Sequence, residues 1–153
     1  MAKKSLSLTD ICRKMMEEGY YPKYEKSHIV FGLKDNLAIV EYNDGILAAR
    51  VFFSIEEDYN ELMLDASNSV MLDTYTVKPV ILDDRQNIMF SCEVMCETLR
   101  DFKRFFPKML CRLEDTIKRH KSEMKELLLA EEAAALVVLP GDKTKIKHRK
   151  PLS

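Results

Sequence analysis

Two cysteines, Cys92 and Cys96, lie four positions apart in the apolar stretch MFSCEVMC, residues 89–96. On a helix this spacing would bring both thiols onto one turn, where they could bind a metal ion or react together. On a strand they would share a face but lie roughly 13 Å apart, because each residue rises ~3.3 Å. That separation is too large for a disulfide or for one zinc ion. The stretch alternates as a strand does, so we interpret both cysteines as core residues, with a reactive or metal-linked pair as the alternative.

The three histidines lie far apart in the sequence, and none has a second ligand at metal-binding spacing. His120 interrupts an apolar seam, which favours a core or interface histidine over a metal ligand and could make association pH-sensitive. A helix start and a turn explain the acidic stretches EEDYNE and LDD without acid–base catalysis. Four isolated glycines and the lack of a nucleophile motif argue against nucleotide-binding and hydrolase chemistry. We therefore expect no enzymatic activity, no catalytic residue, no metal and no cofactor.

The composition is that of one globular domain: of 153 residues, 46% are hydrophobic and 32% are charged. The formal net charge is −1, although residues 140–153 alone carry a net +4. We expect this tail to be disordered because it has few apolar residues, and polybasic tails can contact nucleic acid or acidic lipid. We divide the chain into a single α+β domain at 6–128, a helix extension at 129–139 and the basic tail at 140–153.

The sequence also bears on the compartment. The first residues do not resemble a signal peptide, and no 18 apolar residues run together. All four cysteines have apolar neighbours, so we expect them to be buried and reduced rather than paired in disulfides. These features predict a cytoplasmic protein that does not enter a membrane.

The hydrophobic pattern predicts the elements that must position these residues. An N-terminal helix begins at Ser7, which can form a capping box with Asp10, and ends at Gly19. A second helix follows residues 56–58, and a third begins with Thr98 as its cap; Pro107 should kink or split this last helix. Alternating apolar residues and turns predict five strands between the helices, at 24–33, 37–42, 46–53, 74–82 and 87–95.

This order predicts an α+β fold, helix–βββ–helix–ββ–helix, with an antiparallel five-stranded sheet and helices packed mainly on one face. The turn NDG at 43–45 favours a hairpin, and Pro79 places its strand at an edge or at a bulge. Several strands carry apolar residues on both faces, so the uncovered face needs another layer or another chain. The candidate interaction surface consists of six residues: Tyr42, Phe53, Leu113, Ile117, His120 and Met124.

The element order resembles the YbjN family and the related class I type III secretion chaperone fold. The resemblance rests on the helix LMLDASNSV, which leads into LDTYTVKPVILDDRQNIMFSCEV and then into the capped helix TLRDFKRFF. It covers roughly residues 7–128. It implies a chaperone-like or regulatory binding protein, often dimeric, without catalytic residues. Pro107, the helix beyond Ile117 and the basic tail depart from the pattern.

Three functions follow as hypotheses. The first is a non-enzymatic protein-binding module, a homodimer that presents an apolar sheet or helix surface to another protein, with no specific nucleic acid and no membrane as partner. The second is a small-ligand-binding protein or enzyme with a pocket between the sheet and the C-terminal helix, using His28 or Glu93. The third is a nucleic-acid binder acting through the basic tail. We favour the first.

Overall fold

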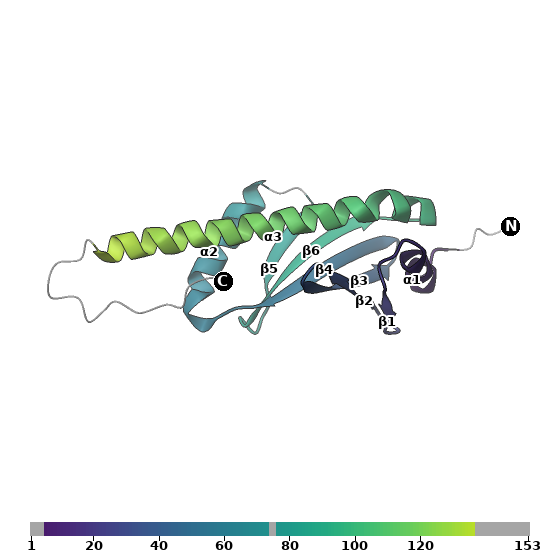
Figure 1. Cartoon of the computed structure of the whole chain (residues 1–153), viewed down its shortest axis with the longest axis horizontal. Coiled ribbons are helices and arrows are strands. Elements are labelled where there is room, and N and C mark those ends of the chain that lie inside the picture. Colours follow the sequence, from purple (N-terminus) through teal and green to yellow (C-terminus); the bar gives the residue numbers. More distant parts are fainter. Residues whose placement is uncertain (1–4, 74–75, 137–153) are drawn as a thin grey trace.

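The computed structural model describes residues 5–73 and 76–136 and shows an α+β fold of three α-helices and an antiparallel six-stranded sheet (Figure 1). The elements in chain order are α1 (Leu8–Glu17), β1 (Lys23–Tyr24), β2 (Ile29–Leu33), β3 (Asn36–Asn43), β4 (Ile46–Ser54), the 3₁₀ turn η1 (Glu57–Tyr59), α2 (Asn60–Asp73), β5 (Val77–Ile81), β6 (Asn87–Met95) and α3 (Leu99–Leu136). The strand order across the sheet is β1-β2-β3-β4-β6-β5.

The ends of α1 are as predicted. The hydroxyl of Ser7 accepts a hydrogen bond from the backbone N–H of Asp10 at 3.2 Å, and the Asp10 carboxylate accepts one from the Ser7 N–H at 3.1 Å. Gly19 ends the segment with a backbone φ of +84°, a conformation that residues other than glycine rarely adopt. The helix buries Ile11, Cys12 and Met15 of the apolar stripe that the 3- and 4-residue spacing predicts, whereas Met16, the fourth residue expected in it, is 59% exposed.

The prediction of five strands was wrong by one. Residues 24–33 do not form a single strand: Lys23–Tyr24 pairs with Ile29–Val30 as a short hairpin. Its turn is closed by a hydrogen bond from the Glu25 N–H to the His28 carbonyl at 2.9 Å, and Lys26 has a φ of +58°. No glycine or asparagine marks this turn, so the sequence lacked the usual signal for a positive φ.

The other turn and edge predictions are confirmed. Asp44 and Gly45 both have positive φ, as a type I′ turn between β3 and β4 requires. Strand β5, which contains Pro79, lies at the edge of the sheet next to β6. Proline is tolerated there because an edge strand needs hydrogen bonds on one side only.

Helix α3 spans 38 residues and runs along the length of the sheet, with α1 near one end and α2 near the other (Figure 1). Its helical hydrogen bonding continues through Pro107, so of the two predicted effects of this proline, a kink or a split, the split is wrong. The proline removes one backbone N–H, which leaves the carbonyl of Lys103 without its helical partner. Both residues are exposed, so water can hydrate that carbonyl. No helix among the described residues is long and apolar enough to span a membrane.

The predicted helix extension at 129–139 is helical as far as Leu136, while the predicted basic tail lies outside the described residues. The apolar stripe of α3 packs on its own chain. Its first half enters the main core with the sheet, through residues such as Phe102 and Leu113. Its second half contacts α2, where Met124 and Leu128 form a separate cluster with residues of that helix.

Aromatic side chains join α1, α3 and the sheet at one end of the core. Phe102 and Phe106 stack on successive turns of α3 with ring centroids 4.7 Å apart. The edge of Tyr20 meets Phe106 at 5.2 Å, and Phe31 of β2 lies 5.7 Å from the same ring. Phe106 is 1% exposed and is shared by all these contacts. Such pairs add about 0.5–1.5 kcal/mol each beyond the burial of apolar area.

Replacing Phe106 should therefore destabilise the fold strongly. We expect Phe106→Ala to lower the free energy of unfolding in urea by about 3–5 kcal/mol, because it removes a fully buried ring and leaves a cavity. The matched control is Phe105→Ala, one residue earlier, where the ring is only partly buried and lies against Arg104. That variant should lose about 1 kcal/mol or less. Equal losses in the two variants would contradict this description of the core.

Candidate functional site: an open sheet face and an apolar pocket

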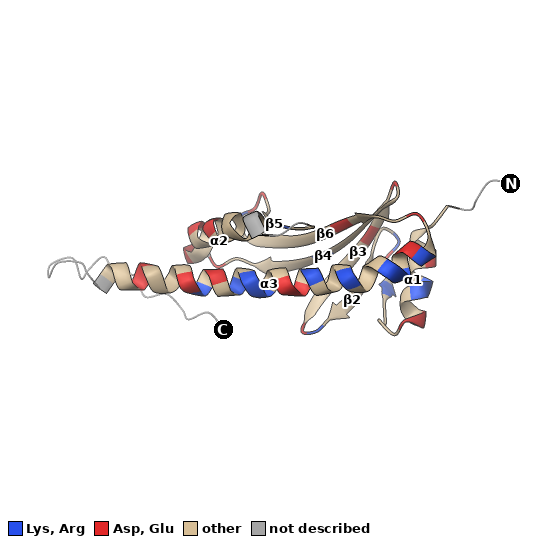
Figure 2. Ribbon diagram, turned by 90° about the horizontal axis from the view of Figure 1, so that it is seen from above, with Lys and Arg blue, Asp and Glu red and all other residues tan. Residues whose placement is uncertain are grey.

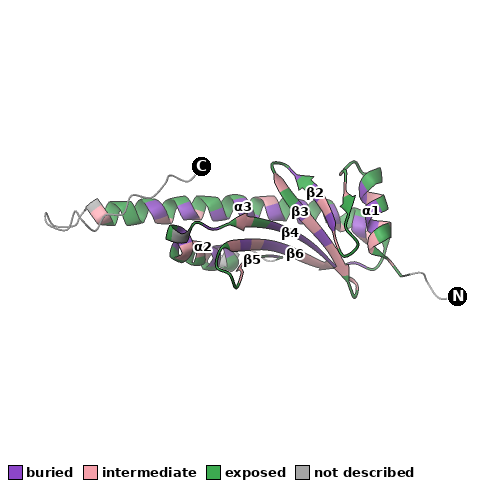
Figure 3. Cartoon of the chain, turned by 90° about the horizontal axis from the view of Figure 1, so that it is seen from below, coloured by how far each residue is buried: buried purple, intermediate pink, exposed green. Residues whose placement is uncertain are grey.

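The helices cover one face of the sheet and leave the other open. Alternate residues of the central strands β4 and β6 point toward the helices and are buried, among them Val51, Phe90 and Cys92. In Figure 3, which views the molecule from below, no helix lies in front of β3, β4 and β6. The side chains of the intervening positions lie on this face, which we call the open face.

An apolar row crosses the open face at one end. The strand registers place Phe52, Met89 and Val80 side by side on β4, β6 and β5, and Leu37 on β3 lies one position beyond the last β3–β4 pair, Ala38–Val51. Leu37 is 71% exposed, while Phe52 and Val80 are also exposed and Met89 is partly buried. Toward the opposite end, Ile46 and Met95 are paired and exposed. Single exposed apolar side chains are common, but a contiguous row across four strands is typical of an interaction surface.

A charged network separates the two apolar regions. Arg50 on β4 forms ion pairs with Glu41 at 3.0 Å and with Glu93 at 3.5 Å, and its Nε donates to the Ser91 hydroxyl at 3.2 Å. Lys78 extends the network to Glu93 at 3.8 Å. The acids and bases balance, so this part of the open face has no net charge. Because Arg50, Glu41 and Glu93 are all partly buried and Arg50 bonds several partners, the network holds its side chains in fixed positions.

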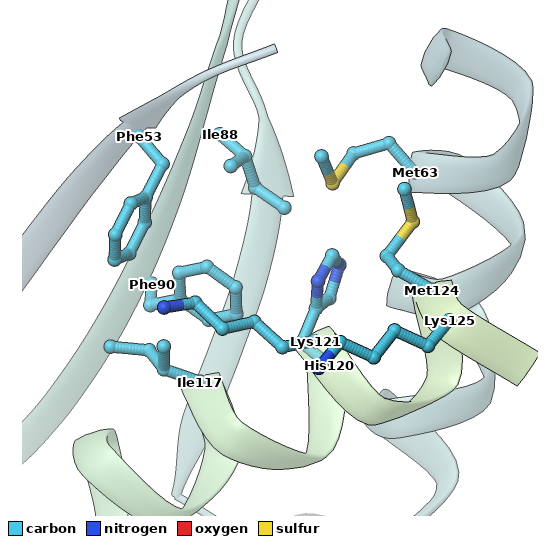
Figure 4. A pocket seen from close by; sticks show the side chains of 9 residues that line it. All are labelled: Phe53, Met63, Ile88, Phe90, Ile117, His120, Lys121, Met124 and Lys125. Carbon is cyan, nitrogen blue, oxygen red and sulfur yellow. The ribbon is translucent and has the colours of Figure 1, made fainter. Parts of the chain in front are cut away.

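An apolar pocket lies on the opposite, helix-covered side, between β4, β6, α2 and α3. Its volume is about 170 Å³, and Figure 4 shows the side chains that surround it. The lining residues are Phe53, Met63, Ile88, Phe90, Ile117, His120, Lys121, Met124 and Lys125. Most are hydrocarbon or thioether side chains, and the polar groups come only from α3. The pocket arises because α2 packs against the second half of α3 rather than lying flat on the sheet.

His120 is the polar residue in the wall of this pocket. Its ring is 4% exposed and meets the Phe90 ring edge-on at a centroid distance of 5.1 Å. Nε2 lies 3.0 Å from the hydroxyl of Ser67 on α2, and that hydroxyl donates to the Met63 carbonyl at 2.7 Å. Burial lowers the pKa of His120 to about 4, and the Met63 carbonyl offsets this only in part. The imidazole is therefore neutral near pH 7.

The Ser67–His120 pair is not arranged as a nucleophile and its base. A catalytic serine donates its hydroxyl proton to the imidazole. Here the single hydroxyl proton of Ser67 is engaged by the Met63 carbonyl, so Ser67 accepts from Nε2–H of His120. Ser67 is also 4% exposed. This contact satisfies two buried polar side chains and joins α2 to α3.

The six predicted interaction residues separate into three groups. Phe53, Ile117, His120 and Met124 come together around the pocket. Leu113 is fully buried in the main core. Tyr42 is partly buried, and its hydroxyl donates to the Cys96 carbonyl at 2.6 Å. None of the six lies in the apolar row of the open face, so an interaction role for them stays a prediction.

Sequence reasoning predicted an uncovered apolar face but chose none of the residues of its apolar row as interaction candidates, and it missed about half of the pocket. Met63 is far in the sequence from Ile88 and Phe90, and it meets them only because α2 packs beside the sheet. For the open face a signal did exist, since Leu37 and Phe52 alternate with inward-facing residues. The suggested polar residues do not reach the pocket: His28 contacts Ser27 at 3.0 Å, and Glu93 belongs to the ion network.

The interpretation of Cys92 and Cys96 as core residues is confirmed. Both are fully buried on the inward side of β6 and its end, and neither is in a disulfide. Burial raises the pKa of Cys92 and raises that of Cys96 to about 11, so both remain thiols. The prediction that all four cysteines are buried was wrong for Cys111, which is exposed because it lies on the outer side of α3. Within residues 5–73 and 76–136, no three potential ligands cluster around a metal site.

The buried state of His120 predicts how stability depends on pH. In the unfolded chain its pKa is 6.5, whereas in the folded protein it is about 4. Between these values the unfolded state binds a proton that the folded state does not, so stability is fully present above pH 6.5 and is lost as the pH falls toward 4. The contribution is up to about 3 kcal/mol.

Urea unfolding at several pH values from 7 to 4 measures this contribution. His120→Gln retains an N–H donor for Ser67 but does not titrate, so its stability should fall less over this range than that of the wild type. His28→Gln is the control, because it makes the same substitution at a histidine that does not line the pocket, and its slope is measured beside that of the wild type. If His120→Gln and the wild type had the same slope, the buried neutral imidazole would be contradicted.

Two solved structures have a similar fold. The crystal structure of YbjN, a proposed transcription regulator from E. coli, matches with a TM-score of 0.62 and 12% identity, over 73% of this chain and 89% of that chain. An uncharacterised protein from Methanothermobacter thermautotrophicus matches with a TM-score of 0.57 and 12% identity, over 79% of this chain and 98% of that chain. No protein-family model and no curated protein sequence matches. The chain thus has a YbjN-like fold, as the order of its elements predicted.

Proposed function

We propose that this protein is a non-enzymatic protein-binding module, chaperone-like or regulatory, that forms a homodimer through the open face of its sheet. The observation that carries the proposal is the apolar row formed by Leu37, Phe52, Met89 and Val80, on a face that none of the helices within residues 5–73 and 76–136 covers. Burying this row against a second chain would remove apolar surface from water, which stabilises the complex by about 25 cal/mol for each Å² of apolar surface buried. The likeness to a proposed regulator agrees with a binding role.

Charge supports a second copy of the chain as the partner. Two identical faces repel each other when they carry a net charge, and a two-fold axis brings the same patch of both copies together. The open face avoids this cost because Glu41 and Glu93 balance Arg50 and Lys78. Its charged groups are already paired within one chain, so a partner needs to supply only apolar contacts around them.

Two further observations support a binding protein in the cytoplasm rather than an enzyme. The Ser67 hydroxyl donates to the Met63 carbonyl and is buried beside His120, as in a structural contact between two helices. All four cysteines carry free thiols, which suits a reducing compartment.

Light scattering after size exclusion tests the dimer. We expect the wild type to have twice the mass of the 17.8 kDa chain at concentrations of about 10–100 µM. Phe52→Glu should shift the protein to the monomer, because it places a charge in the centre of the apolar row. Leu129→Glu is the matched control: Leu129 is equally apolar and more exposed, but it lies on α3, away from the open face.

Circular dichroism of each variant shows whether the fold is intact. A wild type that is monomeric at all these concentrations would contradict the homodimer. A dimer that survives Phe52→Glu but is lost in Leu129→Glu would place the interface on α3 and contradict the role of the open face.

A further inference from the structure

We infer that the pocket between β4, β6, α2 and α3 binds a small amphipathic carboxylate, with an apolar body of about six to ten carbon atoms inside and its acidic head at Lys121 and Lys125. This site lies on the helix-covered side of the sheet, so it is separate from the open face and does not depend on dimerisation.

The size and walls of the pocket define the apolar body. A volume of about 170 Å³ is close to that of an engineered cavity of roughly 150 Å³ that binds benzene. Phe53, Phe90 and the His120 ring form aromatic walls, with Phe53 and Phe90 meeting edge-on at 5.8 Å. A single ring or a short hydrocarbon chain fits such a space. A nucleotide or a peptide has several polar groups, and these would find few hydrogen-bond partners in the walls of this pocket.

Two methionines allow the pocket to adapt to its occupant. Met63 on α2 and Met124 on α3 lie next to each other and face the pocket from opposite helices (Figure 4). Thioether side chains are flexible and polarizable, so they can close around ligands of slightly different shape. Met63 is only partly buried, which leaves it room to move.

The charge at the pocket defines the head of the ligand. Figure 4 shows the Lys121 and Lys125 side chains lying across the near side of the pocket, in front of Phe90 and His120. The Lys121 ammonium lies 5.7 Å from the centre of the Phe53 ring. Within residues 5–73 and 76–136, neither lysine forms an ion pair, whereas Lys34, Arg50 and Lys78 all do.

The spacing of the two lysines makes an anion favourable at this position. Residues four apart on a helix are neighbours, and two like charges there destabilise the helix by a few tenths of a kcal/mol. Acidic and basic side chains are mixed along α3, as Figure 2 shows, and Arg104, Lys108 and Arg112 are also spaced four apart. Lys121 and Lys125 differ from these residues because they lie directly over an apolar pocket. A carboxylate between them would relieve their repulsion while its apolar body replaced water in the pocket.

His120 does not supply the positive charge. Its imidazole is neutral near pH 7, and Nε2 already contacts Ser67. Recognition of the acidic head therefore falls to the two lysines, while His120 contributes its ring to the wall. This division predicts that the charge of the ligand and its apolar body are recognised by different residues, which can be tested separately.

The experiment uses the full chain labelled with ¹³C at the methionine methyl groups, observed by NMR during titration with octanoate or 3-phenylpropionate up to a few millimolar. We expect the methyl signals of Met63 and Met124 to shift and saturate with at least one of these carboxylates. Octylammonium, which has the same chain and the opposite charge, should bind at least tenfold more weakly than octanoate. Exposed methionines such as Met16 and Met95 should not shift, since they lie away from the pocket.

Variants of the lysines test the head of the ligand. Lys121→Gln combined with Lys125→Gln should weaken binding of the carboxylate about tenfold or more and leave the affinity for 1-octanol unchanged. Lys118→Gln is the control, because Lys118 is exposed on the same helix but does not line the pocket. It should bind the carboxylate like the wild type.

Three results would overturn the inference. The first is the absence of shifts at Met63 and Met124 with both carboxylates. The second is equal affinity for octylammonium and octanoate, which would show that the pocket binds hydrocarbon chains without distinguishing a carboxylate from an ammonium group. The third is an equal loss of binding in Lys118→Gln and in the double variant, which would indicate general electrostatic attraction to α3. None of these results bears on the dimer, because that is measured without ligand.

Discussion

The two-residue alternation of β4 and β6 is the constraint on which the rest of this structure depends. These strands pair over nine residues at the centre of the sheet, and each successive side chain points to the opposite face. One set, including Val51 and Phe90, meets α3 and forms the core. The other set, including Phe52 and Met89, faces away from every helix. A shift of register by one residue would exchange the two sets, so the core, the pocket and the open face are all determined together.

The apolar stripe of the long helix α3 packs against elements of its own chain. Its apolar stripe has heptad-like spacing, which is compatible with a coiled coil between two chains. In the structure that stripe is occupied within one chain, first by the sheet at Leu113 and then by α2 at Met124 and Leu128. The expected site of association was a sheet or helix surface, and the packing of this stripe within one chain favours the open face of the sheet.

The junction between α2 and α3 is where apolar packing gives way to polar contacts. His120 and Ser67 satisfy each other and the Met63 carbonyl at 3.0 and 2.7 Å, in a position where unpaired polar groups would cost about 1–3 kcal/mol each. The pocket opens directly beside this contact. A ligand between the two helices would contact α2 at Met63 and α3 at Met124, so occupancy of the pocket would stabilise their relative position.

Local chemistry in the sequence determined the ends and types of most elements. Ser7 with Asp10, the turn at Asp44 and Gly45, Pro79 at an edge and the strand position of Cys92 all act through the nearest few residues, so spacing alone predicts them. The hairpin at Lys26 was not predicted, because no glycine or asparagine marks the residue with positive φ in its turn. The continuity of α3 through Pro107 was not predicted, because it depends on water reaching the Lys103 carbonyl, and this in turn depends on which side of α3 faces solvent. The pocket was decided only by the tertiary structure, since Phe53, Met63 and Lys121 are brought together by how α2 and α3 pack. The sequence predicted an uncovered apolar face, but the tertiary structure decided which strand positions lie on it, because one strand pattern is compatible with helices on either side of a sheet.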